Sequence, residues 1–224
     1  MRIIIFANGD FVPNSYTHTA LQQAELIIAA DNGARYCIDH GILPDVLIGD
    51  LDSLSPHILQ ELETAETEII RHPTEKDATD LELALDYAVA KKATQVTILG
   101  GLGGRWDMSL ANIFLLSHPK YTQLAIMIIG YDHLLYIANP ANPAKLTGRA
   151  GDTISLLPLT PIVEGVETNN LRYPLQKEEL IAASTRGISN QLMTDEALVT
   201  LDAGVLLCVH QLNEDEEISI AYEF

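Results

Sequence analysis

The chain has 224 residues, of which 47% are hydrophobic and 20% charged, and its formal net charge is −18. This composition is typical of a globular protein with a substantial core and excludes a disordered chain. The negative charge argues against a nucleic-acid partner, whose phosphates require basic patches. The apolar runs are far shorter than the roughly 18 residues of a membrane span, so no membrane partner is expected.

The first 130 residues alternate short aliphatic runs with helix-like segments. Continuous aliphatic runs are typical of strands buried on both faces of a parallel sheet. The expected strands span residues 3–7, 26–30, 46–48, 68–71 and 96–99. The expected helices span residues 34–40, 56–64 and 78–92. Asp77 is a good N-cap for the last of these helices. The alternation predicts an α/β domain over residues 1–130 with a doubly wound, mostly parallel sheet.

Beyond residue 130, turn residues separate short strand-like runs, and no long amphipathic helix interrupts them. The expected strands span residues 134–138, 153–157, 162–166, 198–201 and 204–209. This pattern predicts a small all-β sandwich over residues 131–224, with a barrel as the alternative. The two cysteines, Cys37 and Cys208, have no metal-ligand spacing. Two ordinary buried thiols are typical of a reduced, cytoplasmic protein.

Two carboxylates, Asp50 and Asp52, directly follow the apolar run Val46-Leu47-Ile48. In an open α/β sheet, ligands bind at the ends of such strands. If the chain stays extended there, both side chains point the same way. Two adjacent carboxylates repel each other unless a cation neutralises them, and Mg²⁺ is commonly held by such a pair together with a substrate's phosphates. The bland alternative is that Asp50 or Ser53 only caps the next helix.

Three further segments follow predicted strands, and in a doubly wound sheet they would converge on the Asp50–Asp52 pair. The segment Asp31-Asn32-Gly33 allows a tight turn, although such a sequence is more often a plain turn. Lys76 could bind phosphate at a helix N-terminus. Asp80, one turn into that helix, could reach a shared metal or simply complement the helix dipole.

The third segment is a glycine-rich loop over residues 100–104, followed by Arg105. Closely spaced glycines let the backbone approach a phosphate, and Arg105 could bind phosphate oxygens in a bidentate manner. The loop is not a P-loop, because no Gly-Lys-Ser/Thr follows it. Alternatively, Arg105 is a surface residue paired with Asp107.

Together these segments resemble the thiamine pyrophosphokinase (thiamine diphosphokinase) family. The matching stretches are Ala30–Ala34, Pro44-Asp45 with Ile48–Ser53, Lys76–Asp80, and Gly100–Asp107 with Leu110–Asn112. In the second half, Leu171–Leu175 looks like the family segment whose aromatic residue lies against thiamine, and Gly187–Asn190 looks like its Ser-Asn substrate motif. The chain departs from the usual pattern at Asn32, Ala78 and Met108.

The resemblance implies transfer of a diphosphoryl group from ATP to thiamine, with release of AMP, by a Mg²⁺-dependent homodimer. The implied catalytic residues are Asp50, Asp52, Asp80 and Arg105, of which the three aspartates would also bind the metal. The implied ATP-binding residues are Asp31, Asn32, Gly33, Lys76, Gly101, Gly103, Gly104, Arg105 and Asp107. The implied thiamine-binding residues are Tyr173, Ser189 and Asn190. A tyrosine ring suits the cationic thiazolium, although Tyr173 could equally be a core residue.

Two rival functions are kept. One is a Mg²⁺- and ATP-dependent phosphotransferase that acts on a different small alcohol, because substrate choice depends on the sparser match in the second half. The other is a non-catalytic nucleotide sensor with the same fold. Substituting Tyr173 and Ser189 would test the first rival, because loss of thiamine use with ATP binding intact favours the family function. The second rival predicts ligand binding without AMP production.

Overall fold

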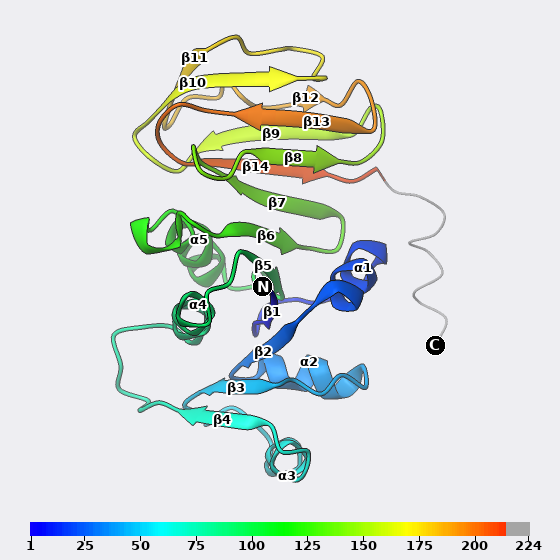
Figure 1. The fold of residues 1–224 in the computed structure, drawn as a ribbon, viewed down its shortest axis with the longest axis vertical. Helices are drawn as coiled ribbons and strands as arrows, with labels where there is room; N and C mark the ends of the chain where they lie inside the picture. Colours follow the sequence, from blue (N-terminus) through cyan, green and yellow to red (C-terminus); the bar gives the residue numbers. More distant parts are fainter. Residues whose placement is uncertain (214–224) are drawn as a thin grey trace. The chain divides into compact units, whose positions relative to one another are not determined.

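The computed structural model describes residues 1–213, which form two compact units (Figure 1). The first unit comprises Met1–Leu116 and Ile128–Gly130. The second comprises Ser117–Met127 and the chain from Tyr131 onward. Strand β6 (Ala125–Ile129) contributes residues to both units.

A parallel sheet forms the framework of the first unit, with its strands in the order β5-β1-β2-β3-β4. The strands are β1 (Arg2–Phe6), β2 (Leu26–Ala30), β3 (Val46–Gly49), β4 (Glu68–Arg71) and β5 (Gln95–Leu99). The aliphatic side chains of β1 and β3 are buried on both faces, which explains their continuous apolar sequences. The predicted parallel sheet is therefore confirmed.

The order of the strands identifies where a ligand would bind. From β1 the chain adds β2, β3 and β4 on one side, and β5 then returns to the other side of β1. The side on which the chain adds strands therefore changes between β1 and β5, although these two strands are parallel. In open α/β sheets, the crevice beyond the carboxyl ends of the strands at such a reversal is where ligands bind.

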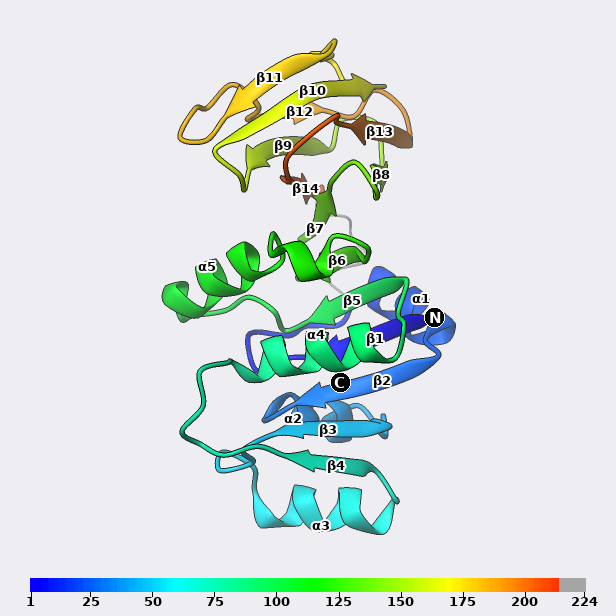
Figure 2. The same ribbon diagram turned by 60° about the vertical axis from the view of Figure 1, so that its left-hand side comes forward.

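Helices cover both faces of this sheet, and Figures 1 and 2 show α2 and α4 on opposite sides of it. The helices are α1 (Ser15–Gln23), α2 (Gly33–Asp39), α3 (Pro56–Thr64), α4 (Asp80–Ala90) and α5 (Trp106–Leu115). None of the helices between residues 1 and 213 has both the length and the apolar character that crossing a bilayer requires.

The start of α4 differs from the sequence prediction. The helix begins at Asp80, and its N-cap is Thr79, whose side chain accepts a hydrogen bond from the Glu82 N–H at 3.2 Å. Asp77 was predicted as the N-cap, but it lies in the preceding loop. Helix α1 was not predicted at all, because its sequence is polar and, of its residues, only Thr17 is buried.

The strands of the second unit form two antiparallel layers, and its predicted sandwich is confirmed. One layer consists of β12-β9-β14-β7, which are part of a ten-stranded sheet, and the other is the four-stranded sheet β11-β10-β13-β8. The strands are β7 (His133–Ala138), β8 (Ala144–Thr147), β9 (Thr153–Pro158), β10 (Ile162–Asn169), β11 (Glu178–Ile181), β12 (Asn190–Gln191), β13 (Glu196–Thr200) and β14 (Leu206–Gln211). Residues from both sheets, including Leu146, Leu156, Val163 and Leu206, form one buried cluster. A short 3-10 helix, η1 (Pro119–Tyr121), also belongs to this unit.

A buried polar cluster joins the end of β14 to the turn before β9. His210 is fully buried, and its Nε2 lies 2.7 Å from Asp152 Oδ2. The same carboxylate accepts hydrogen bonds from the Arg149 N–H at 2.9 Å and from the Asn213 side-chain amide at 2.8 Å. Gly148 leaves the space for this cluster, because a Cβ there would lie 2.3 Å from the imidazole.

Candidate functional site

The chain turns sharply after β3, at the pair Asp50 and Asp52. Leu51 has a φ of 65°, in the left-handed region that few non-glycine residues adopt. The condition of an extended chain, under which both side chains would point the same way, is therefore not met. The turn nevertheless brings the two residues together, because the Asp52 N–H donates to Asp50 Oδ1 at 3.3 Å. A leucine held in this conformation costs energy, and such strain is often found at functional sites.

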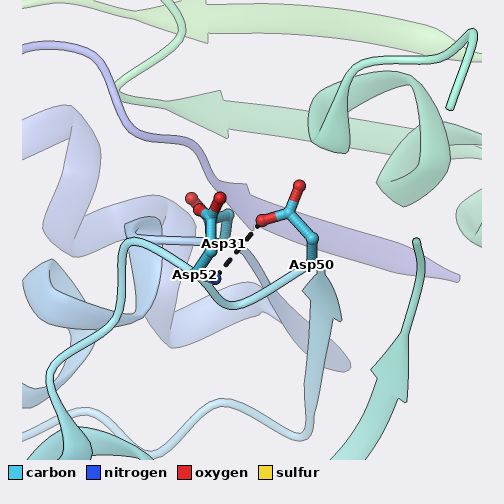
Figure 3. A group of neighbouring side chains, drawn as sticks. All are labelled: Asp31, Asp50 and Asp52. Atoms are coloured by element: carbon cyan, nitrogen blue, oxygen red, sulfur yellow. Dashed lines mark hydrogen bonds between the residues drawn. The ribbon is translucent and has the colours of Figure 1, made fainter. Parts of the chain in front are cut away.

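A third carboxylate, Asp31 at the end of β2, completes the group (Figure 3). One oxygen from each of Asp31, Asp50 and Asp52 lies within 4.8 Å of the others. Asp31 is 8% exposed, and its Oδ2 accepts a hydrogen bond from the Ser53 hydroxyl at 2.5 Å. Its Oδ1 is buried without a hydrogen-bond partner. A buried carboxylate oxygen is costly unless something pairs with it, so this donor set suits a hard divalent cation such as Mg²⁺.

Lys76 lies between Asp50 and Asp80. Its Nζ is 2.8 Å from Asp50 Oδ2 and 2.8 Å from Asp80 Oδ1. Burial opposes the lysine's charge, but hydrogen bonds to the two carboxylates outweigh it and raise the pKa of Lys76. The hydrogen bond from Lys76 also lowers the pKa of Asp50, whereas the hydrogen bond and charge of Asp50 raise the pKa of Asp52. The two aspartates therefore titrate differently.

Two loops meet at the reversal between β1 and β5. The loop after β1 places Gly9 against the glycine-rich loop, since the Gly9 N–H donates to Gly100 O at 2.7 Å. The next residue, Asp10, donates its N–H to Leu102 O at 2.6 Å. A Cβ on Gly9 would lie only 2.1 Å from Leu102 O. Glycine is therefore required for this close approach of two backbones.

Side chains of helix α5 hydrogen-bond to the backbone of the glycine-rich loop. Ser109 Oγ accepts a hydrogen bond from the Gly103 N–H at 3.0 Å and donates to Gly103 O at 3.2 Å. One turn further, Asn112 Nδ2 donates to Gly101 O at 2.7 Å. The loop is thus held in one shape before any ligand binds, which reduces the entropic cost of binding.

These loops and carboxylates border a pocket of about 530 Å³. The predicted site residues among its lining are Asp31, Asp50, Lys76, Asp80, Gly101, Gly103, Gly104 and Arg105. Of the predicted metal- and ATP-binding residues in the described part of the chain, Asn32, Gly33, Asp52 and Asp107 are not part of this lining. A pocket of this size, lined by cations, carboxylates and glycine backbone, suits a nucleotide-sized ligand.

Arg105 is bound to Asp107 rather than directed at the loop. The guanidinium donates from Nε to Asp107 Oδ1 at 3.2 Å and from Nη2 to Oδ2 at 2.5 Å. Both side chains are exposed. The predicted alternative of a surface pair is therefore the arrangement in this structure. An exposed pair of this kind is worth little in stability, so an anionic ligand could compete for Arg105.

The three residues predicted to bind thiamine lie in the second unit. Tyr173 is 56% exposed, so the alternative that it is a core residue is wrong. Ser189 is exposed and has a φ of 60°. Asn190 is 7% exposed, and its side chain hydrogen-bonds to the backbone of Tyr173. The structure therefore brings Tyr173 and Asn190 into contact.

Several pocket residues were missed from the sequence. They are the loop residues Asn8, Gly9 and Asp10 and the α5 residues Ser109 and Asn112. A signal for the first group existed, because Asn8-Gly9-Asp10 follows a predicted strand just as Asp31 and Asp50 do. Nothing comparable distinguishes Ser109, which is a small polar residue inside a helix.

Substituting Gly9 should destabilise the fold, whereas substituting Gly104 should not. For Gly9→Ala we expect a loss of about 1–3 kcal/mol in the free energy of unfolding and weaker nucleotide binding than in the unsubstituted protein, because two backbones must separate. Gly104→Ala is the matched control for stability, since a Cβ there meets nothing within 4 Å. Urea unfolding would compare the two variants, and calorimetric titration with ATP would measure binding by Gly9→Ala. Equal stability of the two variants would contradict the required close approach.

Comparison with known families supports the same division of the chain. The family described as "Thiamin pyrophosphokinase, catalytic domain" matches residues 17–128. The family described as "Thiamin pyrophosphokinase, vitamin B1 binding domain" matches residues 141–206. The two matches fall in the α/β half and the β half of the chain.

Individual relatives agree with these matches. The thiamine pyrophosphokinase of Bacillus subtilis is 30% identical over 209 residues, covering 92% of this chain and 97% of the relative. Its crystal structure superposes with a TM-score of 0.81 at 28% identity, covering 96% of this chain and 100% of the other. That of the Geobacillus thermodenitrificans protein gives a TM-score of 0.79 at 26% identity, covering 96% of this chain and 99% of the other. The chain therefore belongs to the thiamine pyrophosphokinase family.

Proposed function

We propose that this protein is a thiamine diphosphokinase, which transfers a diphosphoryl group from ATP to the hydroxyethyl oxygen of thiamine. A bond forms between that oxygen and the β-phosphorus, the bond from the β-phosphorus to the α-phosphate oxygen breaks, and AMP leaves. The hydroxyl proton is released. The proposal is carried by one observation. The three carboxylates of Asp31, Asp50 and Asp52 lie together, and two of them line a pocket bordered by a glycine-rich loop that hydrogen bonds hold in place. Family membership over both halves of the chain supports it.

We assign residues 1–130 to an ATP-binding catalytic domain and residues 131–224 to a thiamine-binding domain. The matched ranges 17–128 and 141–206 support this assignment. Following the resemblance, we also propose that the protein acts as a homodimer. Sedimentation of the purified protein would test the dimer.

The metal ligands in this proposal are Asp31, Asp50 and Asp52. The partnerless Asp31 Oδ1 supports the inclusion of Asp31, whose metal-binding role was not predicted from sequence. Asp80 stays a prediction as a further ligand, because its carboxylate pairs with Lys76 here. When bound, Mg²⁺ would neutralise phosphate oxygens and favour in-line attack at phosphorus.

The remaining residues of the first domain would bind and orient the nucleotide. Lys76 and Arg105 are the two basic residues of the pocket lining, and they would stabilise charge on the transferring and leaving oxygens. The glycines of residues 100–104 would let the backbone approach the phosphates closely. Asp107 holds Arg105, and Asn32 donates to Asn8 Oδ1 at 3.0 Å, so each would act through a neighbour. Gly33 lets α2 begin against β1, because a Cβ there would lie 2.1 Å from Phe6 O.

Thiamine would bind in the second domain, at Tyr173 and Ser189. The thiazolium ring is a permanent cation, and an exposed tyrosine face attracts such a cation. The guanidinium carbon of Arg172 already lies 5.6 Å from the centroid of this ring. This contact supports the view that the ring accepts a cation.

Magnesium affinity should fall on acidification, and Asp52 should be the first of the pair to lose its charge. Metal ligands must be deprotonated, and Asp50 raises the pKa of Asp52 above that of an ordinary carboxyl group. The loss should therefore begin above about pH 4, the usual carboxyl value. Asp50 keeps its charge to lower pH because Lys76 depresses its pKa. Calorimetric titration with Mg²⁺ from about pH 7 to pH 4 measures this, and a pH-independent affinity would contradict it.

The deciding experiment is AMP release from Mg·ATP by the purified protein, with and without thiamine. Thiamine-dependent AMP, with thiamine diphosphate formed in equal amount, is the expected result. AMP or ADP formed only with another alcohol would favour a different phosphotransferase. Tight nucleotide binding with no product would favour a sensor. Either outcome would overturn the proposal.

A further inference from the structure

We infer that Asn190 is a positioning residue, which holds the Tyr173 turn in place instead of contacting thiamine itself. The inference rests on the proposed function, because it concerns how the thiamine-binding tyrosine is presented. It also changes the role that the family resemblance implies for Asn190, which is that of a direct substrate ligand.

The hydrogen bonds of Asn190 carry the inference. Its Oδ1 accepts from the Tyr173 N–H at 2.9 Å and from the Gln191 N–H at 2.9 Å. Its Nδ2 donates to Tyr173 O at 2.7 Å. Both lone pairs of Oδ1 are thus in use. A flipped amide would face the Tyr173 N–H with another donor, so these contacts also fix its orientation.

The burial of Asn190 and the exposure of Tyr173 point the same way. Asn190 is 7% exposed, so it offers little surface to a ligand. Tyr173 lies in a bend outside any helix or strand, yet its ring is 56% exposed. The side chain of Asn190 therefore satisfies a backbone N–H and C=O that have no partner in a strand, while the ring stays accessible.

Neighbouring residues extend the same connection. The Arg172 N–H donates to Gln191 O at 2.9 Å, and Arg172 Nη1 donates to Gln191 Oε1 at 2.9 Å. Leu171 and Leu192 form an isolated bridge. The aromatic segment is therefore attached along its length to the strand that carries Asn190. Holding the ring in its binding orientation before thiamine arrives lowers the ordering cost of binding.

A double-mutant cycle between Asn190 and Tyr173 tests the inference, with KM for thiamine and for ATP read separately from AMP release. Tyr173→Ala should raise the thiamine KM about 3- to 30-fold, the range expected for a cation–π contact. Asn190→Leu replaces the side chain by one of similar size that cannot form the three hydrogen bonds, and it should raise the thiamine KM by a comparable factor. Asn190→Asp keeps the acceptor and should restore part of the loss. The double variant should resemble Tyr173→Ala alone, because residues that act through one another are not additive.

Asn139→Leu is the matched control. Asn139 is a buried asparagine of the same unit, and it accepts hydrogen bonds from the Ala141 and Asn142 N–H groups in another turn. Its substitution should lower thermal stability as Asn190→Leu does and leave the thiamine KM unchanged. This control separates the effect of general destabilisation from the effect of a displaced Tyr173 ring.

Two results would overturn the inference. If the double variant shows the product of the two single effects on the thiamine KM, Asn190 acts independently of Tyr173 and does not position it. If Asn190→Leu and Asn190→Asp both leave the thiamine KM unchanged, Asn190 has no role in presenting the ring. Should Asn190→Leu fail to fold, the cycle is made with Asn190→Asp. Failure of the proposed function is distinguishable, because the unsubstituted protein would then release no AMP with thiamine.

Discussion

Replacing Asp50 by asparagine should lower kcat/KM for thiamine-dependent AMP release by about 10²- to 10³-fold, the usual cost of losing one strong electrostatic contact to a transition state. The substitution keeps the shape of the side chain and removes its charge. The proposed metal site then retains two carboxylates, and Lys76, 2.8 Å away in the native protein, loses one of its two ion-pair partners and keeps Asp80. A site with less negative charge beside an ammonium group binds a phosphate-bound cation more weakly.

The Asp50 experiment needs a folding control and a charge control. Circular dichroism of Asp50→Asn should match that of the native protein, because the substitution keeps the shape of the side chain. Glu61→Gln is the charge control, since Glu61 is exposed on α3 and should leave the rate unchanged. Direct titration with Mg²⁺ should show weaker binding by Asp50→Asn. Normal magnesium affinity and normal turnover would exclude Asp50 from the site.

The second large effect is expected in stability, at the buried Asp152. Asp152→Ala should lower the free energy of unfolding by about 3–5 kcal/mol, because it leaves several buried hydrogen-bond donors without an acceptor at about 1–3 kcal/mol each. The carboxylate accepts hydrogen bonds from Arg149, Asn213 and the fully buried His210, and all lose their acceptor together. The Nδ1 of His210 already lacks a hydrogen-bond partner, so the imidazole would be left with neither nitrogen paired.

Urea unfolding followed by circular dichroism measures this effect. Asp152→Asn is the conservative variant, because it keeps one acceptor oxygen and should lose less. Glu179→Ala is the control, since Glu179 is an exposed acid on β11 and should change stability by no more than about 0.5 kcal/mol. A loss below 1 kcal/mol for Asp152→Ala would show that the cluster adapts by local rearrangement.

The sequence was sufficient for the sheet and for expecting several of the residues that line one pocket to lie together. Aliphatic runs such as Ile3–Phe6 have few alternatives to a buried strand, and residues that follow parallel strands must share one edge. The start of α4 was less determined, because Asp77 and Thr79 are both good N-caps and tertiary contacts choose between them. Helix α1 lacked an apolar stripe altogether.

Contacts between distant segments were beyond the sequence. Asp31 lies beside Asp50 for two reasons. Strands β2 and β3 pair in one register, and Gly49 leaves room, since a Cβ at that position would lie 3.0 Å from the Cβ of Asp31. Likewise, the residue type of Asn190 suits either a ligand contact or a backbone contact. Only its burial and its distance from Tyr173 distinguish the two roles.

The first residue of α5 has a practical consequence. Trp106 is 77% exposed, follows Arg105 directly, and is the single tryptophan of the chain. Indole emission therefore reports on one position only, at the edge of the glycine-rich loop. The protein carries its own fluorescent probe for events at this loop, and nucleotide association can be followed in real time without attaching a dye.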